Sequence, residues 1–360
     1  MQLLASDAIG GTEAAVCRVA EITPRDEVEM TVMTLSDPGP VAERCRASGL
    51  TSQSLHDAGP AVLRRALLGL RPDIVHAYGF RASMLTRFVA AFIPDVSTVV
   101  GVRGLLNLDC HDPGVPRARV ALRAEALTQR LVAGYEANSQ GAIDLLVSAG
   151  VRPGKTTVTP NGIDLGTWTA PRREPSRSPR LVCVARLTVL KDHHLLLSAV
   201  AILRERCLVA PLVLVGDGAL RDSLEALVRQ LGLADQVRFC GALDPAGVRH
   251  ELGAADVFCL ASLSEGSPGA VLEAMATGLP VVGTAVNGIS DVVVDGVTGA
   301  LVHDRTPAGF ADALEGVLRA APQERAAMGA AARRRVEVSF SEVALVARRL
   351  ALYRRVAERR

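Results

Sequence analysis

The stretch that decides the fold is VFCLASLSEGSPGAVLEAMATGLPVV at residues 257–282. Its apolar start, 257–260, predicts a buried strand, and Pro268 followed by the apolar run 270–276 predicts a helix with proline near its first turn. Gly278 marks the end of that helix. A strand that passes through a loop into a helix is the repeating unit of a doubly wound parallel sheet, which binds ligands at the carboxyl ends of its strands. We therefore expect a ligand site in the intervening loop.

Two carboxylates lie in this stretch, Glu265 in the expected loop and Glu273 in the expected helix. Ionised carboxylates only accept hydrogen bonds, so they suit the vicinal hydroxyls of a sugar or a ribose better than they suit phosphate. The helix would also turn the free backbone N–H groups of Gly269, Ala270 and Val271 toward the crevice, where they favour anionic or hydroxyl-rich groups. These residues are the first candidates for substrate binding.

A second cluster follows the apolar run at 181–185, where Arg186 and Lys191 lie in the expected loop. The chain has 40 Lys and Arg residues, and of these only Lys155 and Lys191 are lysine. Lysine at position 191 suggests that a compact ammonium group is needed there. A planar guanidinium and a point charge together suit a diphosphate, whose negative charge grows as it departs. The pair therefore predicts a diphosphate site.

Further short motifs occur along nearly the whole chain. They are IGGTE at 9–13, PDIVH at 72–76, NS at 138–139, PNGID at 160–164, VGDG at 215–218, VRFCG at 237–241 and DGVTG at 295–299. In this order, and together with Arg186, Lys191 and the glutamate pair, they resemble the retaining glycosyltransferases of family GT4. The resemblance implies a GT-B fold, which is α/β with two doubly wound Rossmann-like domains facing a central cleft.

The resemblance also implies roles for the charged residues. Glu265 would bind hydroxyls of the donor sugar, Glu273 the ribose hydroxyls of the nucleotide, and Arg186 with Lys191 the departing diphosphate. The donor would be a UDP- or GDP-sugar, with no further cofactor. Because the sequence has no Asp-x-Asp motif, we expect these cations and the helix N-termini, and no metal ion, to stabilise the leaving group.

Several glycines are candidates for backbone contact with a ligand. Gly10 and Gly11 follow the first expected strand, and Gly216 and Gly218 follow another apolar strand. Gly288 precedes a short expected helix, where the amides of the family approach the donor phosphates. A tight turn without a ligand is the alternative for the pairs.

One position departs from the family pattern. Many relatives place a histidine at the crevice just after the fourth strand, whereas this chain reads VVGVRG at 99–104. Arg103 could contact the donor phosphate or an anionic acceptor. His76 ends an earlier expected strand, and both a buried structural histidine and a ligand contact are open for it.

The pattern of apolar runs and amphipathic stretches predicts two α/β domains. A polar, proline-rich segment interrupts the pattern and predicts a linker. We expect an N-terminal acceptor-side domain at 1–170, the linker at 171–179, a nucleotide-sugar domain at 180–340 and a final helix at 341–360. The resemblance implies that this helix packs back on the N-terminal domain, and a solvated helix is the alternative.

Composition limits the function. A net charge of +2 and an aromatic content of 3% argue against nucleic acid as a partner. The seven cysteines form no CxxC pair, and no apolar run approaches the ~18 residues of a membrane span, so we expect a cytoplasmic protein without a zinc site. The basic stretch 117–130 leaves peripheral contact with a membrane or a lipid-linked acceptor open, against a solvated helix face.

The expected activity is transfer of a hexose-type sugar to the hydroxyl of a glycan or lipid-linked acceptor, with retention, in polysaccharide or glycoconjugate synthesis. A GT-B phosphorylase or a nucleotide-sugar epimerase is one alternative. The other is a scaffold subunit that binds nucleotide without turnover, motivated by the short first strand and by Arg103.

Overall fold

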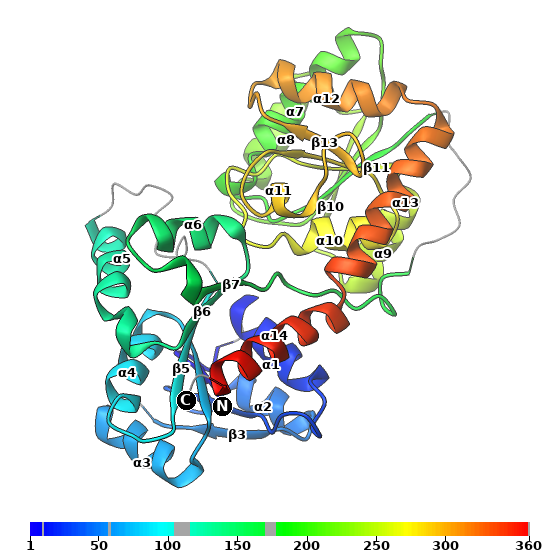
Figure 1. Cartoon of the computed structure of the whole chain (residues 1–360). Helices are drawn as coiled ribbons and strands as arrows, with labels where there is room; N and C mark the ends of the chain where they lie inside the picture. The colour runs from blue at the N-terminus through cyan, green and yellow to red at the C-terminus, as the bar shows by residue number, and fades with distance from the viewer. Residues whose placement is uncertain (9–10, 57–58, 104–115, 170–177, 359–360) are drawn as a thin grey trace. The chain divides into compact units, whose positions relative to one another are not determined.

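The computed structural model describes residues 1–8, 11–56, 59–103, 116–169 and 178–358. It divides into two compact units, the first made of Met1–Asn161 with Glu342–Arg360 and the second of Gly162–Ser341 (Figure 1). Each unit is a parallel sheet with helices on both faces. The predicted fold class, two doubly wound α/β domains, is confirmed.

The boundary between the units differs from the expected one at residue 170. Ile163 and Trp168 are buried in the apolar core of the second unit. The backbone N–H of Ile163 donates to the Phe340 carbonyl at 2.8 Å, and Arg333 donates to the Trp168 carbonyl at 2.5 Å. Two large apolar side chains therefore attach 162–169 to the second unit. The expected linker at 171–179 lies outside the described residues except for its last two positions.

The first unit has a sheet in the order β3-β2-β1-β4-β5-β6-β7 with all strands parallel. The order reverses between β1 and β4, which makes their carboxyl ends the switch point of this sheet. The strands are β1 Gln2–Leu4, β2 Thr31–Thr34, β3 Thr51–Ser54, β4 Ile74–Tyr78, β5 Ser97–Val102, β6 Gly134–Ala137 and β7 Thr156–Val158.

The helices of the first unit form two layers. On one face α1 Gly11–Ile22, α2 Pro40–Ala47 and α14 Glu342–Ala357 pack against Leu4 and Val99. On the other face α3 Pro60–Leu70, α4 Phe80–Ala90, α5 Pro116–Thr128 and α6 Gln140–Ser148 pack against Leu3 and Val100. Consecutive strand residues point to opposite faces, so the alternation of Leu3 with Leu4 separates the two cores.

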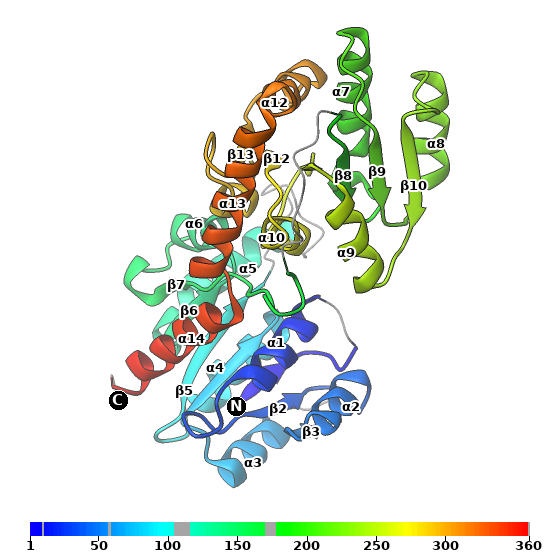
Figure 2. The same cartoon turned by 90° about the vertical axis from the view of Figure 1, so that its right-hand side faces the viewer.

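The second unit has the sheet order β10-β9-β8-β11-β12-β13, also parallel throughout, and Figure 2 shows β8, β9 and β10 side by side. The order reverses between β8 and β11. The strands are β8 Leu181–Val184, β9 Leu212–Val215, β10 Val237–Gly241, β11 Val257–Leu260, β12 Val281–Thr284 and β13 Gly299–Val302. The helices are α7 His193–Glu205, α8 Arg221–Gln230, α9 Pro245–Ala254, α10 Gly269–Ala276, α11 Ile289–Val292, α12 Pro307–Arg319 and α13 Pro322–Ser339.

The strand and helix predicted at 257–276 are therefore β11 and α10. In the described part of the chain, no helix is both long and apolar enough to cross a membrane.

Candidate active site

The switch point of the second sheet brings Lys191 and Glu265 together. Lys191 ends a short 3₁₀ turn, Val189–Lys191, in the loop after β8, and Glu265 lies in the loop after β11. The Lys191 Nζ donates to Oε1 of Glu265 at 2.5 Å, and the side chains are only 20% and 10% exposed. Two residues that are 74 positions apart thus form one charged pair at the edge where parallel sheets bind ligands.

Neighbouring bonds fix this pair. The Ser262 Oγ, which is buried, donates to the same Glu265 oxygen at 2.6 Å. The backbone N–H of Leu263 donates to the Leu190 carbonyl at 2.8 Å, which joins the two loops directly. The glutamate is therefore oriented by one cation and one hydroxyl before any ligand arrives. Ser262 was not predicted, although a polar residue that ends an apolar strand was a visible signal.

Arg186 lies in the same loop as Lys191 and is exposed. Within the described residues, its guanidinium has no hydrogen bond or ion pair. A solvated arginine at a sheet's carboxyl edge can receive a planar anion without breaking an existing bond.

Gly216 and Gly218 hold the loop after β9 against the loop after β8. A Cβ on Gly216, whose φ is +138°, would lie 2.0 Å from the Ala185 carbonyl oxygen, and one on Gly218 would lie 2.5 Å from the Leu187 carbonyl oxygen. The glycines therefore allow close approach of one backbone to another. Their contact with a donor stays a prediction.

The N-terminus of α10 offers fewer free amides than predicted. The N–H of Val271 donates to the Pro268 carbonyl at 3.1 Å, so it is not available to a ligand. Among the described residues, the N–H groups of Gly269 and Ala270 have no acceptor. The space beside the Gly269 Cα is also open. The first turn of α10 thus retains two of the three expected donors.

Glu273 lies one turn inside α10 and is partly buried. No hydrogen bond or ion pair of its carboxylate is present within the described residues. Burial raises the pKa of Glu273 to about 7. A partly buried carboxylate with a raised pKa, in a loop-to-helix region at a sheet's carboxyl edge, is typical of a ligand-binding group.

Gly288 connects the loop before α11 to the glutamate loop. Its φ is +81°, and a Cβ there would lie 2.5 Å from the Gly266 carbonyl oxygen and 2.8 Å from that of Glu265. The position therefore admits only glycine without displacement of the loop that carries Glu265. Whether its amide contacts phosphate stays a prediction.

In the first unit, Gly11 begins α1 and has open space beside its Cα. Gly10 lies outside the described residues. Both stay predictions as ligand contacts.

Arg103 differs from the expectation of a free anion-binding group. Its side chain is 6% exposed, and its guanidinium donates to Asn161 at 3.0 Å and to both carboxylate oxygens of Glu136 at 2.8 and 3.1 Å. The Glu136 carboxylate is fully buried and needs such counter-charges. Arg103 is therefore committed to an internal ion pair in this structure.

The same carboxylate anchors the final helix. Arg349 on α14 donates to Glu136 at 3.0 Å and to the Tyr78 hydroxyl at 2.6 Å, and Tyr353 lies 3.0 Å from Nδ1 of His76. His76 is thus a buried structural residue. Burial first, and then the charges of Arg349 and Arg103, hold its pKa well below the usual range. Sequence reasoning missed Glu136 and Arg349 because nothing local marks a pairing over 213 positions.

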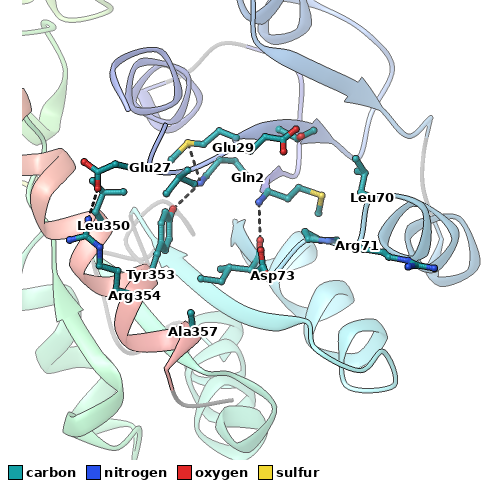
Figure 3. Close-up of a pocket in the computed structure, with 16 residues that line it drawn as sticks. Gln2, Glu27, Glu29, Leu70, Arg71, Asp73, Leu350, Tyr353, Arg354 and Ala357 are labelled. Atoms are coloured by element: carbon teal, nitrogen blue, oxygen red, sulfur yellow. Dashed lines mark hydrogen bonds and ion pairs between the residues drawn. The ribbon is translucent and has the colours of Figure 1, made fainter. Parts of the chain in front are cut away.

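A pocket of about 390 Å³ lies elsewhere in the first unit (Figure 3). It is at the amino ends of β1, β2 and β4, where Gln2, Asp73 and Tyr353 line it and Gln2 donates to the Tyr353 hydroxyl at 2.8 Å. Within the first sheet, this edge is opposite the carboxyl edge, where Gly11 and Arg103 lie.

Comparisons with known proteins agree with this arrangement. Residues 9–167 match the family described as Glycosyltransferase Family 4, and residues 167–335 match the family described as Glycosyl transferases group 1. The D-inositol 3-phosphate glycosyltransferase of Kineococcus radiotolerans is 37% identical over 321 residues, which are 80% of this chain and 72% of that protein. The protein of the same name from Actinosynnema mirum is 30% identical over 349 residues, 85% of this chain and 83% of that one.

Solved structures show the same fold. The Anabaena protein Alr3699/HepE, solved in complex with UDP, superposes with a TM-score of 0.80 at 21% identity over 96% of each chain. That protein was also solved in complex with UDP-glucose. The fold is GT-B, and its two parallel α/β units are those of a glycosyltransferase. The chain belongs to glycosyltransferase family 4, as its motifs predicted.

Proposed function

We propose that this glycosyltransferase moves a hexose from a nucleotide-sugar donor to an acceptor hydroxyl with retention of configuration. The observation that carries the proposal is the contact between Lys191 and Glu265 at 2.5 Å, at the switch point of the second sheet. It brings a cation suited to diphosphate next to a carboxylate suited to sugar hydroxyls, and the diphosphate and the sugar are covalently adjacent in a nucleotide sugar.

The remaining residues extend this donor site. Arg186 supplies a second, solvated cation for the diphosphate, and the amides of Gly269 and Ala270 supply neutral donors. Glu273, whose carboxylate lacks a partner among the described residues, accepts hydrogen bonds from the ribose hydroxyls. Each group is then used for the part of the donor that its chemistry fits.

In the proposed reaction the acceptor oxygen attacks the anomeric carbon from the face that the diphosphate leaves. The new C–O bond forms as the bond from the anomeric carbon to the phosphate oxygen breaks. The acceptor's proton passes to an oxygen of the departing phosphate. Lys191 and Arg186 stabilise the charge on that group, so the mechanism requires no protein nucleophile and no metal ion.

The donor base and the acceptor are inferred from the relatives. The complexes of the Anabaena protein with UDP and UDP-glucose support a UDP-sugar donor, with a GDP-sugar as the second choice. The relatives named D-inositol 3-phosphate glycosyltransferase support an inositol phosphate acceptor. A glycan or lipid-linked acceptor of polysaccharide synthesis is the second choice.

The test is calorimetric titration of the full chain with UDP, GDP and ADP, repeated on Lys191→Ala and Glu273→Ala. Arg229→Ala is the matched control because Arg229 is an exposed cation on α8 of the same unit. We expect one nucleotide to bind selectively and both site variants to weaken it, while the control binds as the wild type does. Equal binding by all variants would place the nucleotide elsewhere.

Turnover is then measured with the matching nucleotide sugars and D-inositol 3-phosphate, with and without EDTA. We expect an α-linked product from an α-linked donor by NMR, and no loss of rate with EDTA. Nucleotide binding without transfer to any acceptor would support a scaffold subunit instead, and product formation without an acceptor would support an epimerase.

A further inference from the structure

Exposed apolar side chains of the first unit gather on one layer of helices. We call this the α3–α5 layer, defined as residues 60–71, 80–92 and 116–131. Within the described residues of the first unit, every large hydrophobic side chain that is exposed belongs to it, except Val343 on α14. They are Val62, Leu68, Leu70, Phe80, Phe88, Phe92, Val120, Leu127 and Leu131. Contiguous exposed apolar surface of this kind marks an interaction site.

The three helices lie side by side. Figure 1 shows α3, α4 and α5 along the same side of the first sheet. A groove of about 580 Å³ runs between α3 and α4, where Pro60, Met84, Phe88 and Phe92 line it. Arg87 on α4 pairs with Glu125 on α5 at 2.6 Å in the interior, which joins those two helices. The exposed apolar residues therefore lie on neighbouring helices of one layer.

The two most exposed apolar side chains of the layer lie at the ends of helices. Phe92 is 80% exposed just after α4, and Leu127 is 82% exposed near the end of α5. Neither residue contributes to a core cluster. Folding does not remove these two side chains from water, so they add no hydrophobic free energy to the stability of the fold. Burial against a partner would add it.

The charge of the layer has one sign. Its only acidic residue is Glu125, which is buried in the pair with Arg87. Its exposed charged side chains are all arginines: Arg64, Arg65, Arg71, Arg81, Arg119, Arg123 and Arg130. The opposite face of the sheet is different, because α1, α2 and α14 carry glutamates together with their arginines. Arginines without exposed glutamates among them thus distinguish the layer that exposes the apolar residues.

Exposed apolar side chains together with exposed arginines favour some binding partners of this layer over others. A second copy of the chain, placed with the same face against this one, would bring arginines against arginines without a carboxylate to separate them. An anionic bilayer surface attracts each arginine and accepts exposed phenylalanine and leucine at the boundary of its acyl chains. A bilayer surface also needs no shape complementary to the layer, because acyl chains adapt to the groove between α3 and α4.

We propose that the α3–α5 layer docks the enzyme on an anionic lipid membrane, with Phe92 and Leu127 inserted at the interface and the arginines at the headgroups. This contact is independent of the donor site, whose residues belong to the second unit. It also extends the basic stretch predicted at 117–130, because α3 and α4 contribute more exposed aromatic surface than α5 does.

The test is co-sedimentation of the full chain with vesicles of phosphatidylcholine alone and of phosphatidylcholine mixed with phosphatidylglycerol. One variant combines Phe92→Ser with Leu127→Ser, and another combines Arg64→Gln, Arg65→Gln and Arg123→Gln. Val343→Ser is the matched control, because Val343 is 80% exposed on α14 in the other layer. All the substituted side chains are exposed, so thermal unfolding should be unchanged.

We expect binding to the anionic vesicles and little to the neutral ones. The arginine variant should lose about fivefold in partition per charge removed. The apolar variant should lose roughly tenfold or more, and the control should match the wild type. Absence of binding at low salt would overturn the proposal, as would equal loss in the control. A dimer in sedimentation equilibrium that Phe92→Ser with Leu127→Ser dissociates, without vesicle binding, would assign the layer to a second copy instead.

Discussion

Lys191 and Glu265 neutralise each other across 2.5 Å, although their predicted ligands are different parts of one donor molecule. A carboxylate that already holds the ammonium competes with a diphosphate for it. Binding of the diphosphate must therefore weaken this pair, or share the ammonium, and part of the binding free energy is used for that exchange. Glu265 thus holds the Lys191 ammonium in one position at the carboxyl edge of the sheet.

Removal of the negative charge of Glu265 should therefore strengthen the binding of nucleoside diphosphate. Glu265→Gln leaves Lys191 without its anionic partner, so we expect affinity for UDP alone to rise by about fivefold, which corresponds to roughly 1 kcal/mol. Turnover should fall, because the amide is a weaker acceptor for sugar hydroxyls. Calorimetry with UDP and rate measurements with the nucleotide sugar separate the two effects. Weaker binding of UDP by Glu265→Gln would contradict this account of the pair.

Glu273 makes the stability of the protein depend on pH. Burial raises its pKa from 4.5 to about 7, so the folded state binds a proton that the unfolded state releases between these values. Its contribution to stability is fully present below pH 4.5 and is lost as pH rises through 7. Glu273→Gln should therefore raise the free energy of unfolding at pH 8 by about 3 kcal/mol, with little change at pH 4.5. Denaturant unfolding at both pH values measures this.

The matched control for that experiment is Glu205→Gln, since Glu205 is an exposed carboxylate on α7 of the same unit. It should be neutral at both pH values. A loss of stability in Glu273→Gln at pH 8 would show that the carboxylate has a structural partner. Stabilisation combined with loss of nucleotide binding would be the signature of a group kept for function.

The fold, and the loops that contain Lys191 and Glu265, could be predicted from local sequence patterns. The strand and helix around Glu265, and the loop with Lys191, follow from apolar runs, proline and glycine whose effects act within a few residues. The sequence also predicted that Lys191 and Glu265 lie in loops at the carboxyl ends of strands, but their ion pair was not predicted. The amide of Val271 could not be assigned from sequence, since its bond to Pro268 depends on how tightly the first turn closes.

The buried ion pairs could not be predicted from the sequence. Arg103 has the position of a crevice ligand, and only the fold shows that Glu136 and Asn161 occupy its guanidinium. The boundary at Asn161 was likewise set by Trp168, whose burial in the second core no local pattern indicates. Long-range choices of partner decide both features, and they leave no periodic signal.

The start of the loop after β8, which carries Lys191, is packed against Gly216. A Cβ at this position would lie 2.0 Å from the Ala185 carbonyl oxygen, and the φ of +138° is strained for any other residue. Gly216→Ala should destabilise the protein by about 3 kcal/mol or more. Gly232→Ala is the control, because its φ is +68° but its Cβ would meet nothing within 4 Å, and we expect a cost of only about 1 kcal/mol. Denaturant midpoints compare the two, and equal costs would contradict the packing argument.

Among the residues that the structure describes, Glu136 is the one carboxylate paired with two buried arginines, Arg103 at 2.8 Å and Arg349 at 3.0 Å, and it is itself fully buried. Glu136→Gln keeps the shape but leaves two cations in the interior without an anion, so we expect a loss of about 3 to 5 kcal/mol. The loss should be smaller in Arg349→Met, since removal of one cation leaves Glu136 paired with Arg103. When Glu136→Gln and Arg349→Met are combined, the losses in the free energy of unfolding should be far from additive, because both residues belong to one network. Unfolding of the three variants in denaturant measures this coupling, and simple additivity would show that Glu136 and Arg349 do not act as one network.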